Sequence, residues 1–195
     1  MRRTNWYVIT GAPCSGKTAV ISELEQQGYQ VVHEVARAYI DEQLQTGQSI
    51  SQIKADILSF ESHILYQKIE IERLLPETAV IFLDRAVPDS IAYYMLERLD
   101  PTEPVYNSRL TRYKKIFFFE RLVFEKDDVR SEDDKIAAKV ERLLQESYEM
   151  LNYDVVYVPV MSVKERIDFI LNVISNSTKE WNRPQKGKKH HTDSR

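Results

Sequence analysis

The first stretch of this chain whose residue types could do chemistry is residues 11–18, Gly-Ala-Pro-Cys-Ser-Gly-Lys-Thr. It has the G-x-x-x-x-G-K-T spacing of a phosphate-binding loop, or P-loop. Glycine at both ends permits backbone angles that let successive N–H groups surround an anion. In such a loop the lysine reaches the terminal phosphates of a nucleoside triphosphate, and the threonine hydroxyl binds Mg²⁺. We therefore predict a site for Mg²⁺ with ATP or GTP, in which Lys17 is catalytic and Thr18 a metal ligand, formed by Gly11, Ala12, Pro13, Cys14, Ser15, Gly16, Lys17 and Thr18.

The flanking segments decide between a genuine P-loop and a chance match in an ordinary strand–helix turn. Residues 4–10 are mostly apolar, as in a buried strand. Residues 17–27 place Ala19, Ile21 and Leu24 along one inward face, and Gly28 ends the predicted helix. Strand, glycine-rich loop and helix follow in the order that a P-loop requires, so we interpret the match as genuine.

Strand and helix patterns alternate along the rest of the chain. The predicted strands cover residues 4–10, 30–33, 79–84, 115–120 and 154–158. The predicted helices cover residues 17–27, 35–44, 49–75, 89–98, 107–114, 131–151 and 163–174, with loops at 100–104 and 121–131. This alternation implies an α/β fold of three layers, with a five-stranded, mostly parallel central sheet flanked by helices.

Charged residues follow the predicted strands directly, at the edge where such sheets bind ligands. Asp84 ends the most apolar strand, where a carboxylate holds the Mg²⁺ shell of P-loop enzymes. The alternative is a strand-terminal aspartate that caps the next turn. Arg85 could bind a second anion with both arms of its guanidinium, or it could pair with Asp84 or Asp89. We assign Asp84 to catalysis and metal binding, and Arg85 to substrate binding.

Glu34 follows the strand at 30–33 and would lie across the predicted cleft from the γ-phosphate. A carboxylate there could take the proton of an attacking hydroxyl, which makes Glu34 a candidate catalytic and substrate-binding residue. Arg37, one turn further on, would share its face and could steady an anionic substrate. The alternative is a glutamate at a helix N-terminus that is stabilised by the helix dipole.

Basic residues recur in the charged segment 121–131. Phosphoryl transfer needs cations that close over the developing negative charge, so we predict a lid that supplies Arg130 for catalysis and Arg121 for substrate binding. The alternative is a solvated loop, because acidic neighbours such as Asp127 and Asp128 dilute the positive charge.

Length and composition indicate one globular domain. Of the 195 residues, 43% are hydrophobic and 29% charged, and the net charge of −3 gives no sign of a nucleic-acid or anionic-membrane partner. No apolar run approaches the ~20 residues of a membrane span, and we expect no signal peptide. The single cysteine excludes an internal disulfide, so we expect a reducing, cytoplasmic location.

Apolar residues become rare near the end of the chain. We predict a domain over residues 1–176 and a polar, disordered tail over 177–195, locally basic at Lys186, Lys188 and Lys189. A solvated tail is favoured over a contact with nucleic acid or lipid. The sequence leaves the oligomeric state open between monomer and dimer.

Taken together, residues 5–175 resemble the small AAA-domain P-loop family that is similar to the ribosylnicotinamide kinase domain of NadR, and more distantly resemble deoxynucleoside and thymidylate kinases. The matching segments are Ile9–Thr18, Gly28–Arg37, Phe82–Arg85 with Asp89 and Tyr93, Phe118–Arg130, Tyr148–Pro159 and Glu165–Arg166. Two positions depart from the family pattern: Ala86 stands where relatives often have glycine, and Cys14 where they have glycine or alanine. Neither departure removes a catalytic group.

The resemblance implies a kinase-like fold with a lid, and ATP-dependent phosphoryl transfer to a small nucleoside- or nucleotide-like acceptor. It also implies roles for particular residues: Glu34 as base or substrate ligand, Asp84 for Mg²⁺, Arg85, Arg37 and Asp89 on the substrate side, and Arg130 in the lid. Two alternatives are a GTP- or ATP-binding regulatory switch that acts through a protein partner, and an ATPase subunit of a larger assembly. The sequence lacks the Asn-Lys-x-Asp motif that reads guanine in classical GTPases, which favours the kinase.

Overall fold

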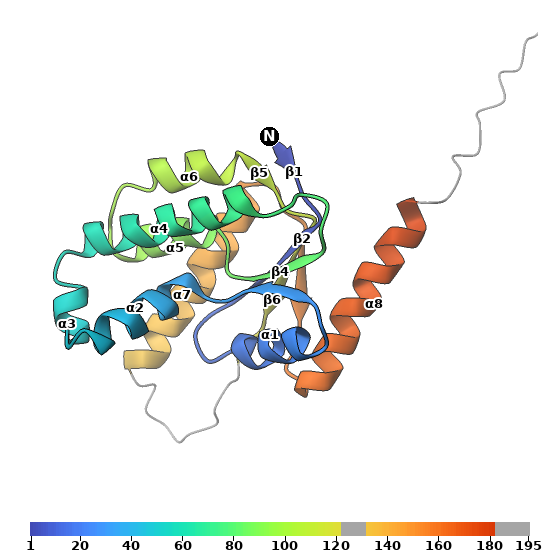
Figure 1. The fold of residues 1–195 in the computed structure, drawn as a ribbon, viewed down its shortest axis with the longest axis horizontal. Helices are drawn as coiled ribbons and strands as arrows, with labels where there is room; N and C mark the ends of the chain where they lie inside the picture. Colours follow the sequence, from blue (N-terminus) through green and yellow to red (C-terminus); the bar gives the residue numbers. More distant parts are fainter. Residues whose placement is uncertain (122–131, 182–195) are drawn as a thin grey trace, which may run out of the picture.

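The computed structural model describes residues 1–121 and 132–181 and has a parallel sheet at its centre (Figure 1). The sheet has five strands in the order β3-β4-β2-β6-β7, and every neighbouring pair is parallel. Their bounds are β2 Trp6–Thr10, β3 Gln30–Val32, β4 Ile81–Asp84, β6 Lys115–Phe119 and β7 Val155–Val158. The predicted three-layer α/β fold is therefore confirmed, and its sheet is parallel throughout.

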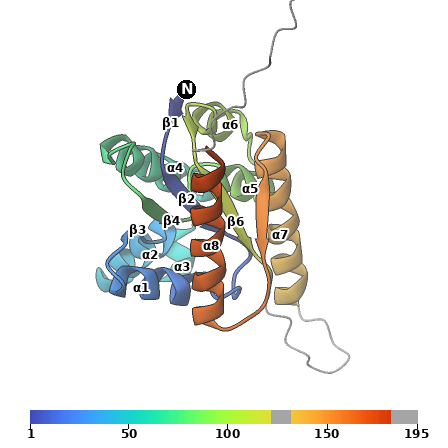
Figure 2. The ribbon, with the colours of Figure 1, turned by 90° about the vertical axis from the view of Figure 1, so that its right-hand side faces the viewer.

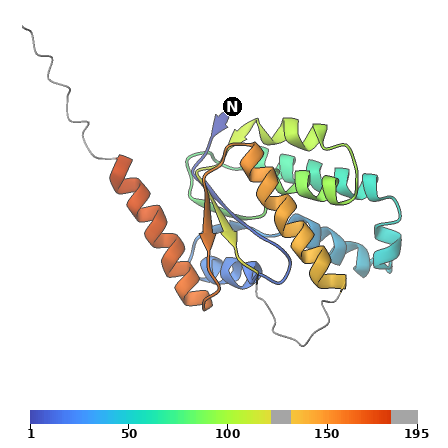
Figure 3. The same cartoon turned by 180° about the vertical axis from the view of Figure 1, so that it is seen from behind.

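Helices cover both faces of this sheet, because alternate side chains of each strand point to opposite faces. Tyr7 and Ile9 of β2 pack with α1 (Lys17–Gln26) and α8 (Val163–Trp181). Trp6 and Val8 lie in the cluster on the other face, beside α5 (Asp89–Leu96) and α7 (Glu132–Met150). Figures 2 and 3 show α7 and α8 on opposite sides of the strands.

The remaining helices form an outer group beside the second face. α4 (Ile57–Leu74) packs against α5 and against α2 (Val35–Gln45), and the short helices α3 (Ile50–Ile53) and α6 (Thr102–Ser108) lie at either side (Figure 1). The apolar contact between α2 and α4 is made by Val35, Phe60 and Ile64. This packing fixes α2 and α4 as the walls of a space next to the P-loop.

The single helix predicted over residues 49–75 is wrong, because two capping signals divide it. Ser49 and Gln52 form a reciprocal capping box that begins α3. The carboxylate of Asp56 then accepts a hydrogen bond from the backbone N–H of Ser59 and begins α4.

The predicted helix over 107–114 is also wrong. The helix α6 begins earlier, where the backbone N–H of Thr102 donates to Asp100 Oδ1 at 3.0 Å. Pro104 falls in its first turn, where a missing N–H costs nothing. Residues 111–112 instead form β5 (Thr111–Arg112), which pairs in parallel with β1 (Arg2–Arg3).

The last helix continues to Trp181, beyond the residue at which the sequence pattern ends it. The segments 122–131 and 182–195, which hold most of the predicted lid and tail, lie outside the described residues. Within the described residues, no helix combines the length and the hydropathy needed to cross a membrane.

A buried carboxyl group ties the outer helices to the sheet. Glu72 of α4 accepts hydrogen bonds from the Tyr113 hydroxyl at 2.9 and 2.8 Å and from the backbone N–H of Val87 at 3.2 Å. Burial raises the pKa of Glu72 to about 7, although these hydrogen bonds act in the opposite direction. Glu72 therefore changes its charge near neutral pH.

We expect this carboxyl group to make stability depend on pH. Its folded pKa lies above the ordinary value of 4.5, so its contribution to the free energy of unfolding is complete below pH 4.5 and is lost as pH rises through about 7. A shift of this size corresponds to about 3 kcal/mol. Glu72→Gln, which has no proton to lose, should remove that part of the pH dependence in urea unfolding at pH 5 and pH 8. The exposed Glu70→Gln serves as the control, and equal pH dependence in the two variants would contradict the assignment.

Candidate functional site

The predicted P-loop follows β2 directly and has the backbone that its glycines were expected to provide. Gly11 and Gly16 have φ angles of 139° and 83°, and Cys14 also has a positive φ of 60°. A Cβ atom on Gly11 would lie 2.5 Å from the carbonyl oxygen of Phe119, so the loop needs glycine there to pass the end of β6. The sequence motif is thus formed as a loop packed against the sheet.

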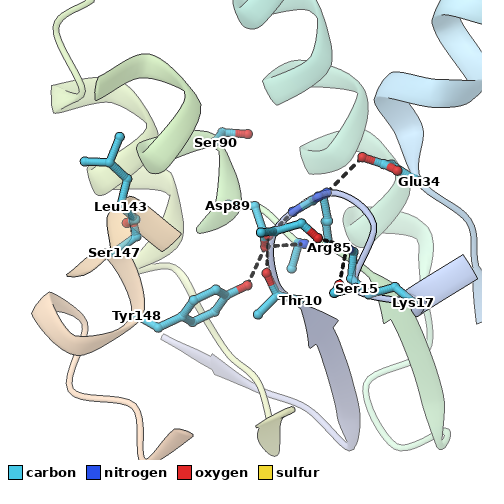
Figure 4. Close-up of polar contacts among 12 residues, drawn as sticks. Thr10, Ser15, Lys17, Glu34, Arg85, Asp89, Ser90, Leu143, Ser147 and Tyr148 are labelled. Carbon is cyan, nitrogen blue, oxygen red and sulfur yellow. Dashed lines mark hydrogen bonds and ion pairs between the residues drawn. The ribbon is translucent and has the colours of Figure 1, made fainter. Parts of the chain in front are cut away.

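Lys17 lies under this loop with its ammonium group held by loop oxygens. Its Nζ donates to the carbonyl oxygen of Ala12 at 2.8 Å and to Ser15 Oγ at 3.0 Å (Figure 4). Burial, aided by the charge of Arg85, lowers the pKa of Lys17 to about 8, while nearby carboxylates act in the opposite direction. A charge so poorly hydrated favours an anionic ligand, because an anion would restore the solvation that burial removes.

The N-terminus of α1 also favours an anionic ligand. Gly16 is its N-cap and supplies no side-chain hydrogen bond, so the first N–H groups of the helix have no capping side chain. Thr18 is exposed in the first turn. Free N–H groups and the positive end of the helix dipole together make an anion site of the kind that binds phosphates.

Asp84 ends β4 directly beside the start of the P-loop, since it is in register with Ile9. It is buried, and its Oδ1 has no hydrogen-bond partner among the described residues. Burial first, and then the charge of Glu34, raises the pKa of Asp84 to about 6. An orphaned carboxylate oxygen beside a P-loop fits a bound cation.

The described residues contain no group of three or more His, Cys, Asp or Glu side chains that could hold a metal ion by itself. This agrees with Mg²⁺ rather than opposing it, because Mg²⁺ in phosphate sites takes one or two protein ligands and completes its shell with water and phosphate. Asp84 and Thr18 would be those protein ligands.

Arg85, which follows Asp84, makes hydrogen bonds to two carboxylates, Glu34 before α2 and Asp89 at the start of α5. Arg85 has a positive φ of 68° and is held in this conformation by three contacts. Its N–H donates to the carbonyl oxygen of Ile9, its Nε to Glu34 Oε1 at 2.8 Å, and its Nη1 to Asp89 Oδ1 at 3.3 Å (Figure 4). Arg85 therefore pairs with Glu34 and Asp89, one of the alternatives left open by the sequence.

Asp89 is held in place by hydrogen bonds to both of its carboxylate oxygens. It is fully buried and accepts hydrogen bonds from Thr10 Oγ1 and from the Tyr148 hydroxyl, both at 2.5 Å, and from the backbone N–H of Ala86 at 3.0 Å (Figure 4). Burial alone would raise the pKa of Asp89, but Arg85 and these donors together lower it. With four donors on two oxygens, Asp89 has no oxygen left for a ligand.

Glu34 keeps its charge in the same surroundings. Burial would raise the pKa of Glu34, but the charge and hydrogen bond of Arg85, together with Lys17 and Lys68, lower it. About three-tenths of the Glu34 side chain is accessible, at 29%. It is thus an ionised carboxylate, part of which faces open space.

That space is a cavity of about 230 Å³ between α2, α4 and α5. Its lining includes the predicted residues Glu34, Arg37 and Arg85, and none of the P-loop residues 11–18. The cavity and the P-loop are therefore two neighbouring sites that meet at Glu34 and Arg85. The volume is below the ~300–1,000 Å³ of drug-sized pockets, so it suits one small molecule.

Two residues of this cavity were missed by the sequence analysis. Glu61 and Lys68 of α4 both line it, and each is only 5% exposed. A signal for them exists, because they lie on the same helical face as the buried Leu65 and Glu72. Charged residues that recur within the apolar face of a predicted helix would have identified them.

The other predicted site residues lie in different surroundings. Arg37 is exposed and pairs with Asp41 at 3.1 Å at the rim of the cavity. Arg121 is paired with two carboxylates of α7, Asp134 at 3.1 Å and Glu141 at 3.9 Å, and it does not line the cavity. Arg130 lies outside the described residues.

Arg166 of α8 contacts the P-loop from the side opposite the cavity. Its Nη1 donates to the carbonyl oxygen of Ser15, its Nε donates to the carbonyl oxygen of Pro159 at 3.2 Å, and its guanidinium stacks on the Phe119 ring. A Cβ atom on Gly16 would lie 2.9 Å from Nη1. In the sequence Arg166 stands out only as part of a segment that resembles the family, and its contact with the loop is visible only in the structure.

Comparison with known proteins agrees with this geometry. A family model described as an AAA domain matches residues 6–166. None of the curated proteins compared with the chain matches it.

Solved structures with a similar fold include NadR and two kinases. NadR in complex with NR has a TM-score of 0.65 at 15% identity, and the match covers 90% of this chain but only 52% of NadR. Deoxyadenosine kinase from M. mycoides has a TM-score of 0.61 at 17% identity, with 88% and 99% of the two chains covered. Thymidylate kinase from Candida albicans has a TM-score of 0.56 at 17% identity, with 90% and 93% covered. At these identities the likeness establishes the fold, which is that of P-loop nucleoside and nucleotide kinases.

The Arg166 contact leads to a prediction about the loop. Because Arg166 holds the loop backbone, Arg166→Ala should weaken Mg·ATP and Mg·tripolyphosphate binding equally, by about tenfold or more, as expected for a lost charged hydrogen bond. Isothermal titration calorimetry measures both. Lys164→Ala is the control, since Lys164 is exposed on the same helix and pairs with Asp168. Unchanged affinity for tripolyphosphate would mean that Arg166 does not order the loop.

Proposed function

The chain belongs to the AAA-domain family whose model it matches, and from this premise we propose that it is a Mg²⁺-dependent phosphotransferase. It transfers the γ-phosphoryl group of ATP, or of GTP, to a small nucleoside- or nucleotide-like acceptor. The observation that carries this proposal is the cavity beside the P-loop, with a carboxylate at the junction of the two sites. A nucleotide switch or a simple hydrolase has no use for such a cavity, so the cavity favours the phosphotransferase over both.

On the nucleotide side, the N–H groups of Gly11–Thr18, the ammonium of Lys17 and the start of α1 bind the phosphates. Mg²⁺, held by Thr18 and Asp84, would supply positive charge to the terminal phosphates when bound. Lys17 adds a cation whose burial strengthens its attraction for the charge that develops during transfer.

On the acceptor side, Glu34 takes the proton. In the transfer step an acceptor hydroxyl oxygen forms a bond to the γ-phosphorus, the bond from that phosphorus to the bridging oxygen breaks, and the nucleoside diphosphate leaves. The hydroxyl proton passes to the Glu34 carboxylate, which is ionised and partly accessible. Arg85 holds Glu34 by the hydrogen bond at 2.8 Å.

We propose different roles for two of the residues assigned to the substrate from the sequence. Asp89 has no oxygen left for a substrate, so it positions Arg85 and the end of β2 instead. Arg121 forms ion pairs with Asp134 and Glu141 of α7, so we propose that it anchors that helix. Arg37 lies at the rim and stays a proposed acceptor ligand, and the lid role of Arg130 stays a prediction from the sequence.

Binding of the nucleotide can be tested without knowing the acceptor. At one hundred times its dissociation constant, Mg·ATP or Mg·GTP should stabilise the fold by ~2.7 kcal/mol, seen as a rise in melting temperature. Lys17→Ala should abolish the rise, and Asp84→Asn should remove the part that requires Mg²⁺. A protein that melts at the same temperature with and without millimolar nucleotide would contradict the nucleotide site.

A substitution at Glu34 should lower turnover without weakening nucleotide binding. Glu34→Gln should keep Mg·ATP affinity within about threefold, because the Glu34 side chain is hydrogen-bonded to Arg85 rather than to residues 11–18, and lower turnover by ~10²–10⁴, the usual loss of a general base. Product formation with a panel of nucleosides as acceptors measures turnover. The matched control is Glu42→Gln, an exposed residue of the same helix. If hydrolysis to water is the only activity and Glu34→Gln leaves it unchanged, the acceptor-base role is wrong.

A further inference from the structure

Glu61 is a buried carboxyl group without a hydrogen-bond partner. It is 5% exposed and lines the cavity, yet it makes no hydrogen bond with any residue in the parts of the chain that the structure describes. Glu72, on the same helix and equally buried, accepts hydrogen bonds from two donors, the Tyr113 hydroxyl and the backbone N–H of Val87. Among the described residues, the Glu61 oxygens are not counted with the enclosed polar atoms that lack a partner, so they are reached from the cavity and can accept a hydrogen bond from a group that enters it.

The position of Glu61 within the cavity indicates which part of an acceptor it meets. Lys68 is seven residues further along α4, which places it two turns away, or ~10 Å along the helix axis. Lys68 acts on both Glu34 and Asp89, and so lies toward the end of the cavity where we propose that phosphate is transferred. Glu61 also feels the charge of Lys68, but Lys54 and Glu97 act on Glu61 and not on Glu34 or Asp89, so Glu61 lies toward the other end.

The walls between the two ends are apolar and partly aromatic. They are formed by Phe60 and Ile64 of α4, Ile40 of α2, and Tyr93 and Leu96 of α5. Such walls suit a flat heterocycle, because ring faces pack well against aromatic and aliphatic side chains. An acceptor with its reactive hydroxyl at Glu34 would therefore place its ring between these walls and the outer edge of the ring at Glu61.

The charges of the cavity also favour a neutral acceptor. Arg85 is held by Glu34 and Asp89, and Lys68 donates to Ser90 Oγ at 3.1 Å in the field of the same carboxylates. The two other cations of the lining also have partners, since Arg37 pairs with Asp41 at 3.1 Å and Lys54 lies 5.1 Å from the centre of the Phe60 ring. Each cation of the cavity thus already has a partner within the protein, which favours an acceptor without a phosphate group.

We propose that Glu61 selects the acceptor by accepting a hydrogen bond from an exocyclic NH₂ group on its heterocycle. The acceptor class is then an unphosphorylated nucleoside whose base carries an amino group on the edge away from the sugar. This inference rests on the proposed phosphotransferase function and names the substrate class of the same site. A base with a carbonyl oxygen at that edge leaves Glu61 facing a second acceptor, which is unfavourable.

The experiment compares bases that differ at this one group. The probes are adenosine against inosine and cytidine against uridine, each measured for binding by calorimetry and for phosphorylation by Mg·ATP. The amino member of at least one pair should be preferred in kcat/KM by roughly tenfold or more, the cost of an unpaired buried acceptor. Glu61→Gln should bring that ratio to about one, because an amide can donate as well as accept. Glu70→Gln, exposed on the same helix, should leave the ratio unchanged.

The outcomes separate this inference from the proposed function. Phosphorylation without a preference for amino bases, or a preference that survives Glu61→Gln, would overturn the role of Glu61 and leave the phosphotransferase intact. Amino nucleosides that bind, lose their advantage in Glu61→Gln and yet accept no phosphate would support Glu61 and overturn the phosphotransferase. The wild-type preference needs no variant, and the melting temperature of Glu61→Gln shows that its fold is retained.

Discussion

The hydrogen bonds to the buried carboxylate of Asp89 hold the two sites of this protein together. Its two oxygens join the last residue of β2, the turn after β4 and helix α7 through Thr10, Arg85 and Tyr148. Removing one partner of such a buried, charged network leaves an uncompensated charge, which typically costs 3–5 kcal/mol. The network is therefore a strict constraint on sequence, and it explains why Arg85 can hold a left-handed backbone conformation at the junction of the two sites.

The charged residues around Asp89 lie at two different sites. Lys17 faces the P-loop, Glu34 faces the cavity, and Arg85 lies between them with its hydrogen bonds already made. Acidic and basic side chains alternate along this line, so each keeps its charge although most of its surface is buried. In the function that we propose, this arrangement would let a triphosphate and an acceptor be held by different residues while their reactive groups approach the same carboxylate.

Helix α4 carries one buried carboxyl group that joins it to the sheet and another that lines the cavity. Its inner face carries Glu61, Lys68 and Glu72 among apolar residues. Glu72 is satisfied by the chain itself and joins α4 to the sheet, whereas Glu61 is left facing the cavity. The difference comes from the neighbours that the fold brings to each carboxyl group, because the two residues are chemically the same.

The sequence by itself determined the P-loop, the order of strands and helices, and the parallel sheet with Asp84, Arg85 and Glu34 at one edge. These features follow from local spacing and from alternation along the chain, which tertiary packing left unchanged. It could not determine the break between α3 and α4 or the start of α6, since capping groups compete with helix periodicity at those points. Nor could it separate Asp89, saturated by donors from distant segments, from Glu61, which has none among the described residues. Only the tertiary structure decided which buried charges are satisfied, because their partners lie far away in sequence and meet only when the helices pack on the sheet.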